Sequence, residues 1–461
     1  MAAKICRKNP KDGFQTPAFE HPKIQLRNLS ALKAARRNAR THSAKQLSQI
    51  AKSIETFGFV NPILVDIDGH IVAGHGRAEA ARKLGLNKVP VICLDHLNQS
   101  ELRAYAIADN RLAELAGWDK DILALELADL ITIDNAFDVS VTGFDHAEID
   151  LTIQGQTNVV DTADEIPDVP AADKAETRLG TLWQLGPHRI ICADVRDREA
   201  IERLMDGERA RMVFTDPPYN VPIGGHVSGL GRQHHREFAV ASGEMTPEEF
   251  TGFLKASLAN LAAASADGAL HYICMDWRHL GELMSAGQSV YTEMKNLCVW
   301  NKTNGGMGSF YRSKHELVLI YKRGRAKHIN NIELGRFGRY RSNVWEYAGV
   351  NTWRKGRQQD LSDHPTVKPV LLVADALQDA SNRGDIVLDG FGGAGTTLMA
   401  AEKIGRRARL IELDPRYVDV AVMRWQKATG LKAVNGDTGR PFSEIRARGV
   451  ENIPSYKRAR S

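Results

Sequence analysis

From about Leu179 onward, short apolar runs alternate with helical patterns, and this alternation constrains the fold more than any other feature. The runs that we expect to be strands are Ile190–Cys192, Met212–Phe214, His271–Cys274, Leu317–Ile320, Ile386–Leu388 and Leu410–Ile411. Wholly apolar strands that are separated by helices are typical of a mostly parallel sheet with helices on both faces. We therefore predict an α/β, doubly wound domain in this part of the chain.

The chain has 461 residues, which is enough for two or three domains. We expect a flexible basic tail at residues 1–20, a smaller α+β domain at 21–120, a helical extension at 121–155, an acidic linker at 156–178 and the large α/β domain at 179–455. Acidic residues, small residues and two prolines give 156–178 its linker composition.

Residues 62–84 carry the local signals of the smaller domain. Pro62–Val65 and His70–Ala73 read as two strands that Asp68 and Gly69 connect in a hairpin turn. A helix then begins at the sequence Gly74-His75-Gly76-Arg77.

Composition excludes several other classes of protein. No apolar run is long enough to span a membrane, and residues 1–14 are too polar and basic for a secretory signal. The five cysteines are scattered, with neither a disulfide framework nor the spacing of a zinc site. We therefore expect a cytoplasmic protein without a metal.

A glycine-rich turn follows one predicted strand, at 388–397, and is itself followed by a helix. Such a turn lets the backbone approach a ligand closely. Glu412 ends the next strand, where a carboxylate can accept hydrogen bonds from ribose hydroxyls. The alternative is a tight packing turn and a surface glutamate.

Asp216-Pro217-Pro218-Tyr219 follows another predicted strand. An aromatic amine is a poor nucleophile because its lone pair is delocalised into the ring. The Asp216 carboxylate and the Pro217 carbonyl could hold both amino hydrogens, on a backbone that the prolines stiffen. Tyr219 offers a flat face on which a base rotated out of a duplex could stack. The alternative is a rigid Pro-Pro turn.

With these motifs in this order, residues 180–430 resemble the amino-methyltransferase family of DNA methylases, in the permuted form in which the catalytic motif precedes the cofactor loop. The catalytic motif matches completely, whereas the loop departs from the family at Gly390, where proline is usual, and at Ala394, where serine is usual. The resemblance implies a Rossmann-like class I methyltransferase fold, S-adenosyl-L-methionine as cofactor and double-stranded DNA as substrate. The cofactor residues that it implies in the loop are Asp389, Phe391, Gly393, Gly395 and Thr396.

Two further elements fit this resemblance. His364, Thr366 and Lys368 belong to a His-Pro-x-x-Lys-Pro block that in the family lies against the methionine part of the cofactor, although a capped helix start would use similar residues. Asp194 ends a strand and could bond the adenine amino group of the cofactor, or it could equally cap a helix.

The family places its target-recognition region between the two motifs, and a basic segment at 323–363 lies there. Its arginines alternate with aromatic residues and could contact phosphate or guanine, although a charged stretch is often only a solvated surface. The arginines that we assign to DNA are Arg336, Arg339, Arg341, Arg354 and Arg357.

The target base is inferred from one residue. Methylation at carbon 5 of cytosine requires a cysteine nucleophile, in that family within Pro-Cys, and this dipeptide does not occur. Aspartate at position 216 resembles the adenine enzymes, whereas cytosine enzymes more often carry serine there. We expect the N6 amine of adenine to be methylated, with the N4 amine of cytosine as the alternative.

Residues 22–115 resemble the ParB N-terminal (ParB/sulfiredoxin-like) domain, through motifs that include Gly58–Ile63, Gly74–Ala81 and Ala108–Arg111. Related domains bind nucleotide, and Gly74, Gly76 and Arg77 suit a phosphate. His75 stands where partition proteins usually have an acidic residue. A DNA-positioning module, a nucleotide-dependent DNA-binding protein, a bifunctional methylase–nuclease and a homodimer all remain open. The segment 304–317 also looks like a block of phage and prophage methylases.

Overall fold

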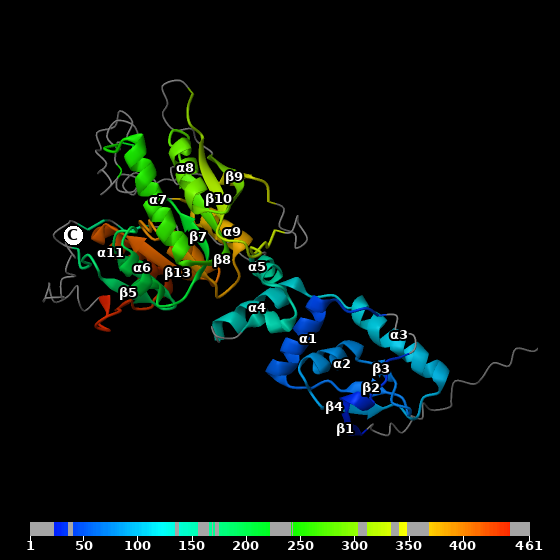
Figure 1. The fold of residues 1–461 in the computed structure, drawn as a ribbon. Helices are drawn as coiled ribbons and strands as arrows, with labels where there is room; N and C mark the ends of the chain where they lie inside the picture. Colours follow the sequence, from blue (N-terminus) through cyan, green and yellow to red (C-terminus); the bar gives the residue numbers. More distant parts are fainter. Residues whose placement is uncertain are drawn as a thin grey trace, which may run out of the picture. The chain divides into compact units, whose positions relative to one another are not determined.

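The computed structural model describes residues 23–35, 40–133, 138–154, 166–167, 169–170, 175–221, 241, 243–302, 311–332, 341–347 and 368–442. The chain divides into two compact units between Asp145 and His146 (Figure 1). The boundary falls within the expected helical extension at 121–155, so the last helix of that segment belongs to the second unit.

The first unit contains a four-stranded sheet among its described residues, in the order β1-β4-β2-β3. The strands are β1 Ile24–Asn28, β2 Ile63–Val65, β3 Ile71–Ala73 and β4 Lys88–Cys93. β2 and β3 pair antiparallel, which confirms the predicted hairpin, while β2 and β4 are parallel. The buried side chains of Ile63, Val65, Val89 and Val91 alternate along β2 and β4 and form the small core of this unit.

The first unit contains several helices, one of which starts directly after Gly74, as the sequence predicts. They are α1 Ala44–Phe57, α2 His75–Lys83, α3 Gln99–Leu115 and α4 Lys120–Ile133, with short 3-10 helices at Leu29–Ala31 and Val139–Thr142. Ser43 caps α1 by accepting a hydrogen bond from the Gln46 amide, and Gly58 ends it at a positive φ of 78°.

In the second unit, the described residues form a ten-stranded sheet in the order β11-β9-β10-β8-β7-β12-β13-β6-β5-β14. The strands are β5 Leu182–Leu185, β6 His188–Cys192, β7 Ala210–Thr215, β8 Ser265–Met275, β9 Glu293–Lys302, β10 His315–Lys322, β11 Val344–Tyr347, β12 Ile386–Asp389, β13 Arg407–Glu412 and β14 Val434–Asn435. The five central strands from β8 to β6 are parallel, and β10 joins them antiparallel. This confirms the doubly wound α/β fold.

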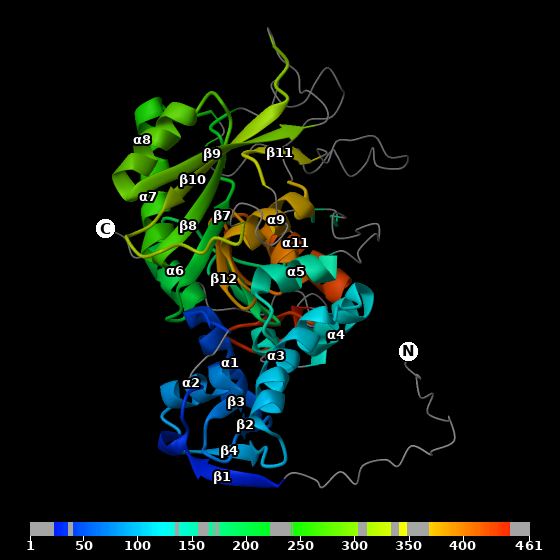
Figure 2. The ribbon, with the colours of Figure 1, turned by 90° about the vertical axis from the view of Figure 1, so that its right-hand side faces the viewer.

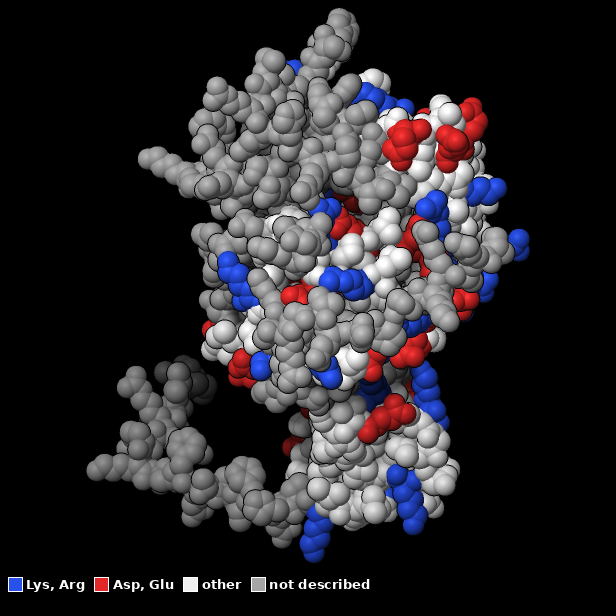
Figure 3. Space-filling view, turned by 90° about the vertical axis from the view of Figure 1, so that its left-hand side faces the viewer, with Lys and Arg blue, Asp and Glu red and all other residues white. Residues whose placement is uncertain are grey.

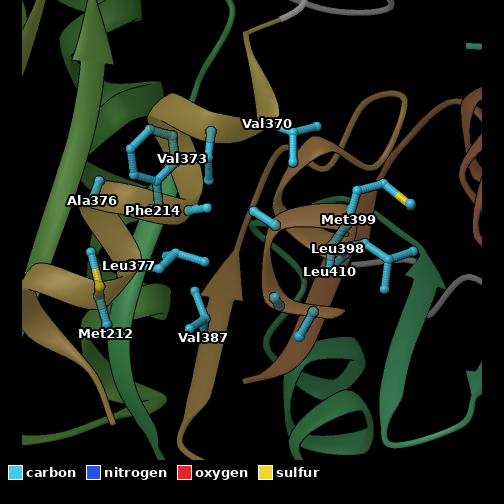
Figure 4. Packing of buried hydrophobic residues seen from close by; sticks show 14 of the residues in the cluster. Met212, Phe214, Val370, Val373, Ala376, Leu377, Val387, Leu398, Met399 and Leu410 are labelled. Carbon is cyan, nitrogen blue, oxygen red and sulfur yellow. The ribbon is translucent and has the colours of Figure 1, made fainter. Parts of the chain in front are cut away.

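Helices cover both faces of this sheet (Figure 2). On one face lie α6 Arg198–Met205, α7 Pro247–Ala263 and α8 Leu280–Val290. On the other lie α9 Val370–Ala380, α10 Thr396–Lys403 and α11 Pro415–Thr429. Successive residues of a strand point to opposite faces, so Met212 and Phe214 pack toward α9, whereas Val213 packs toward the other helices (Figure 4).

Two buried polar contacts hold the segments that precede the sheet. Asp150, on α5 (His146–Gln154), pairs with Arg383 and Arg406, each at 2.9 Å. Thr177, at the end of the expected linker, is buried, and its amide donates to Asp419 of α11 at 3.1 Å. The ends of the segment between α5 and β5 are therefore anchored on the second unit. None of the described helices is long and apolar enough to cross a bilayer.

Candidate active site

The two motifs found in the sequence meet at the carboxyl ends of neighbouring parallel strands. β7 leads into Asp216, and β12 ends at Asp389, with Val213 opposite Leu388 in the register. The Thr215 hydroxyl donates to Asp389 Oδ1 at 2.9 Å, and the Gly390 amide donates to the Thr215 oxygen at 3.2 Å. Hydrogen bonds thus join the catalytic motif directly to the glycine loop.

Asp389 also holds the two ends of the glycine loop. Its carboxylate accepts from the Phe391 amide at 3.0 Å and from the Thr397 hydroxyl at 2.6 Å. Burial raises the pKa of Asp389 to about 6, against the opposing effect of these hydrogen bonds. The carboxylate is therefore an internal anchor of the loop, and its contacts are to protein groups.

Close packing explains two of the glycines in the loop, Gly390 and Gly395. Gly395 has a φ of +79° at the start of α10, and a Cβ there would lie 2.8 Å from the Ala421 Cβ. Gly390 stands where the family usually has proline, and its space is filled by Val195, whose Cγ2 would be 2.8 Å from a Cβ. The departure from the family at Gly390 is thus matched by its neighbours. The buried Arg424 of α11, which the sequence did not single out, donates to the Ala394 carbonyl at 3.1 Å.

Glu412 lies at the loop, as its position after β13 predicts. Its carboxylate accepts from the Gly393 amide at 2.7 Å and from the Asp414 amide at 2.8 Å. Burial raises its pKa to about 7, although both amides act to lower it. A carboxylate has about four acceptor positions, so Glu412 keeps capacity for further donors. It is not the exposed surface glutamate of the alternative interpretation.

Asp216 accepts hydrogen bonds from two side chains. The Tyr219 hydroxyl donates to its Oδ1 at 2.6 Å, and the Lys368 ammonium group donates to its Oδ2 at 2.6 Å. Burial raises the pKa of Asp216, while Lys368 opposes this effect. The sequence grouped Lys368 with the cofactor residues, whereas the structure brings its ammonium group to the carboxylate of Asp216.

Two charged residues near Asp216 were not identified as site residues from the sequence. Glu316 of β10 lies 2.9 Å from the Lys368 ammonium group, and Lys302 of β9 forms an ion pair with Glu316. Glu316 belongs to the segment that resembles phage methylases, which was the only signal in the sequence. Strand pairing brings the two residues to Asp216, and motif spacing does not reveal it.

Asp194 does not cap a helix, so this alternative was wrong: the cap of α6 is Asp197, which accepts from the Ala200 amide at 3.2 Å. Asp194 instead accepts from the Arg196 amide at 2.8 Å and from its guanidinium group at 2.6 Å. A pocket beside it is lined by residues that include Ala193 and Leu413. Bonding of Asp194 to a cofactor stays a prediction.

Of the arginines assigned to DNA, the described residues include Arg341 alone. Its guanidinium group pairs with Asp379 at 3.1 Å, donates to the Tyr347 hydroxyl at 2.7 Å and is mostly buried, an arrangement that favours a structural role over DNA contact. On the described surface that Figure 3 draws, acidic and basic side chains are interspersed. The predicted site residues that lie outside the described residues are Arg336, Arg339, Arg354, Arg357, His364 and Thr366.

In the first unit, the residues predicted to bind phosphate lie together at the start of α2. Gly74 adopts a φ of 99°, and the Arg77 guanidinium group folds back so closely that a Cβ on Gly74 would be 2.9 Å from it. Gly76 is buried and packs against His42. Among the residues that the structure describes, the Nε atom of Arg77 and the Nε2 atom of His75 are buried and have no hydrogen-bond partner.

Comparison with known families agrees with this arrangement. A family model described as a DNA methylase matches residues 210–423, which include both motifs of the second unit. A ParB N-terminal domain model matches residues 15–111, and a ParB-methyltransferase HTH domain model matches 121–179. The last match covers the segment that we had expected to be a helical extension and a linker.

Two curated relatives match different parts of the chain. The ParB-like nuclease domain-containing protein YnaK of Escherichia coli (strain K12) is 46% identical over 82 residues, which are 18% of this chain and 94% of YnaK. The type II methyltransferase M.HpaI of Haemophilus parainfluenzae is 25% identical over 252 residues, which are 51% of this chain and 73% of M.HpaI.

Solved structures also resemble the two parts. The M1.HpyAVI–SAM complex is 20% identical, with a TM-score of 0.38, over 51% of this chain and 97% of that one. The truncated partitioning protein ParB of Caulobacter crescentus, complexed with CTP-gamma-S, is 22% identical, with a TM-score of 0.26, over 29% of this chain and 77% of that one.

The packing of the glycine loop gives a prediction about stability. Gly395→Ala should reduce the free energy of unfolding by about 3 kcal/mol, because the new methyl group must adopt a left-handed conformation and displace Ala421. Gly393 is the matched control: its φ is +49°, but a Cβ there would meet nothing within 4 Å, so Gly393→Ala should cost about 1 kcal/mol. Chemical denaturation of both variants measures the difference, and equal losses would contradict the packing argument.

Proposed function

Since the chain belongs to the N6/N4 family of DNA methylases and carries an N-terminal ParB-like domain, we propose that it methylates the exocyclic N6 amine of adenine in double-stranded DNA. That it is a DNA methyltransferase follows from the family. The observation that carries the proposal is the position of Asp216 directly after Thr215, whose hydrogen bonds with Asp389 and Gly390 join it to the glycine loop.

The cofactor is S-adenosylmethionine, which supplies an electrophilic methyl group on a sulfonium sulfur. The loop fits such a group because Gly390 and Gly395 pack closely against neighbouring side chains. Glu412 also accepts a hydrogen bond from the loop, so its carboxylate lies directly against it. We assign the ribose to Glu412, and the rest of the cofactor to Phe391, Gly393, Gly395 and Thr396. Asp389 supports the loop from within.

Asp216 would accept one hydrogen of the target amine, and the Pro217 carbonyl would accept the other. Lys368 favours the ionised form of Asp216, and an ionised carboxylate only accepts hydrogen bonds. The nitrogen lone pair then faces away from Asp216. The Tyr219 hydroxyl donates a hydrogen bond to Asp216 at 2.6 Å, and this bond fixes the orientation of the ring. A flipped base could stack on the face of this ring. Orientation of the amine supplies most of the rate enhancement in this scheme.

Adenine is favoured over cytosine by the aspartate at position 216 alone. The same geometry could hold the N4 amine of cytosine, which is therefore the second candidate. Analysis of the methylated nucleosides distinguishes the two products, because N6-methyl-2′-deoxyadenosine and N4-methyl-2′-deoxycytidine differ in mass.

A prediction about catalysis concerns Asp216. Asp216→Asn should lower the rate of methyl transfer to DNA by about a hundredfold or more, because the amide no longer offers two acceptor oxygens. Transfer of a labelled methyl group to duplex DNA measures the rate, and equilibrium dialysis should show unchanged cofactor binding.

Asp206→Asn is the matched control for this variant, since Asp206 is an exposed carboxylate of the same unit. It should leave the rate unchanged. If Asp216→Asn kept the wild-type rate, or if the label reached only protein or RNA, the proposed function would be wrong.

A second prediction concerns the pH dependence of cofactor binding. Because the pKa of Glu412 is raised to about 7, the ionised fraction falls about tenfold between pH 8 and pH 6, and the affinity for S-adenosylmethionine should fall with it. Calorimetric titration of wild type and Glu412→Gln tests this, and the variant should bind weakly at both pH values. In the ligand-free protein the sign is opposite: this group reduces stability as the pH rises from 4.5 to about 7, since the folded state retains the proton.

We further propose that the first unit binds the phosphate groups of a nucleotide at the start of α2. The buried Arg77 Nε and His75 Nε2 atoms find no hydrogen-bond partner in the described part of the chain, which supports this role, as does the left-handed Gly74.

Equilibrium dialysis of the full chain with each of the four ribonucleoside triphosphates should detect binding. Arg77→Ala should weaken that binding at least about tenfold, the cost of one charge-assisted contact. Arg82→Ala, which alters an exposed arginine in the last turn of the same helix, should not. Absence of binding for all four nucleotides would remove this proposal.

A further inference from the structure

Four charged side chains of alternating sign lie in contact at the catalytic motif. In order they are Lys302, Glu316, Lys368 and Asp216. The Lys368 ammonium group lies 2.6 Å from one carboxylate, that of Asp216, and 2.9 Å from the other, that of Glu316. Lys302 pairs with the second oxygen of Glu316. The charges sum to zero, so the cluster is electrically balanced without a substrate.

Different elements supply the members of this cluster: Lys302 and Glu316 lie on strands, Asp216 follows β7 and Lys368 precedes α9. Glu316 on β10 lies opposite Trp300 on the antiparallel β9, and Lys302 follows two residues later on the same face of β9. The Trp300 ring lies 4.6 Å from the Lys302 ammonium group and 5.9 Å from that of Lys368. The register of β9 and β10 therefore fixes Glu316 and Lys302 beside Lys368.

Lys368 has more carboxylate partners than its burial requires. Its side chain is 5% exposed, and a buried ammonium group needs a compensating charge. Asp216 alone would supply that charge. With Glu316 also present, the ammonium group is shared, and Asp216 retains more of its negative charge for another hydrogen-bond donor.

We propose that Glu316 is a positioning residue for methyl transfer, which shares Lys368 with Asp216 and so leaves Asp216 free to accept a hydrogen of the target amine. Lys302 balances the charge of Glu316. The inference rests on the proposed function, because it concerns the way in which Asp216 holds its substrate.

The ionisation of the cluster agrees with this role. Although burial acts to raise the pKa of Glu316, Lys368 and Lys302 lower it to about 2, so Glu316 stays charged throughout the neutral range. Burial raises the pKa of Asp216, Lys368 lowers it, and Glu316 raises it again. Glu316 therefore makes Asp216 a stronger hydrogen-bond acceptor.

Other titratable groups face Asp216 from the neighbouring elements. Burial raises the pKa values of Tyr219 and of Cys274 on β8 well above their usual values, so both remain protonated near neutral pH. Among the described residues, Asp389 at the end of β12, with a pKa of about 6, also titrates nearby. Variants of Glu316 and Lys302 leave these three side chains unaltered.

The test compares Glu316→Gln with wild type in single-turnover transfer of a labelled methyl group to duplex DNA between pH 5 and pH 9. With Glu316 neutral, Lys368 pairs with Asp216 alone, so the rate at pH 8 should fall about tenfold or more, as for one unit of acceptor pKa. The affinities for DNA and for the cofactor should change little. The acidic limb of the rate profile should move to lower pH, because a negative charge beside Asp216 is lost.

Glu316→Asp, which keeps the charge, should recover part of the rate. Glu293→Gln is the matched control, since Glu293 lies at the exposed start of β9 and pairs with Lys295. It should behave as wild type.

Lys302→Met provides an independent variant if Glu316→Gln does not fold. It leaves Glu316 to Lys368 alone, so the acidic limb should move in the opposite direction, to higher pH. Unshifted limbs, or limbs that move in the same direction, would overturn the inference while leaving the proposed function intact. A wild-type protein that transfers no methyl group to DNA would overturn both.

Discussion

The buried carboxylate of Asp389 is the interaction on which the second unit's site depends. It accepts hydrogen bonds from Thr215, at the end of β7, and from Phe391 and Thr397, on either side of the glycine loop. These bonds hold together two segments that are 174 residues apart in the sequence. The cost is a buried charge whose pKa rises to about 6, and the parallel pairing of β7 with β12 makes the arrangement possible.

Much of this arrangement is predictable from local sequence. The central strands each carry a run of apolar residues because both faces of the sheet are covered, so these runs and the fold class follow from the pattern. The positions of Asp216 and Glu412 follow as well, because a ligand site in such a sheet lies beyond the carboxyl ends of its strands. The outer strand β9 escaped prediction because it carries exposed polar residues over its first half. The outer strand β11 escaped prediction because it has only four residues, of which one is buried.

The partners of the Asp216 carboxylate were harder to predict, because they come from other elements of the fold. Lys368 was recognised as part of a motif, but its contact with Asp216 depends on how α9 packs beside β7. Glu316 and Lys302 reach the site only through the register of an antiparallel pair, which sequence spacing does not specify. The sequence left a helix-cap role open for Asp194, and this alternative was wrong because the geometry selects Asp197, a suitable residue three positions later.

The chain combines a ParB-like domain with a unit that carries the motifs of a DNA methylase, and we propose that this unit holds the target amine at Asp216. The central claim is that this amine belongs to adenine in DNA. The most direct measurement is the identification of modified nucleosides, with sequencing of their positions, in DNA from cells that express the chain. We expect N6-methyladenine at a defined sequence, whereas DNA that gains N4-methylcytosine instead, or neither methylated base, would contradict this claim.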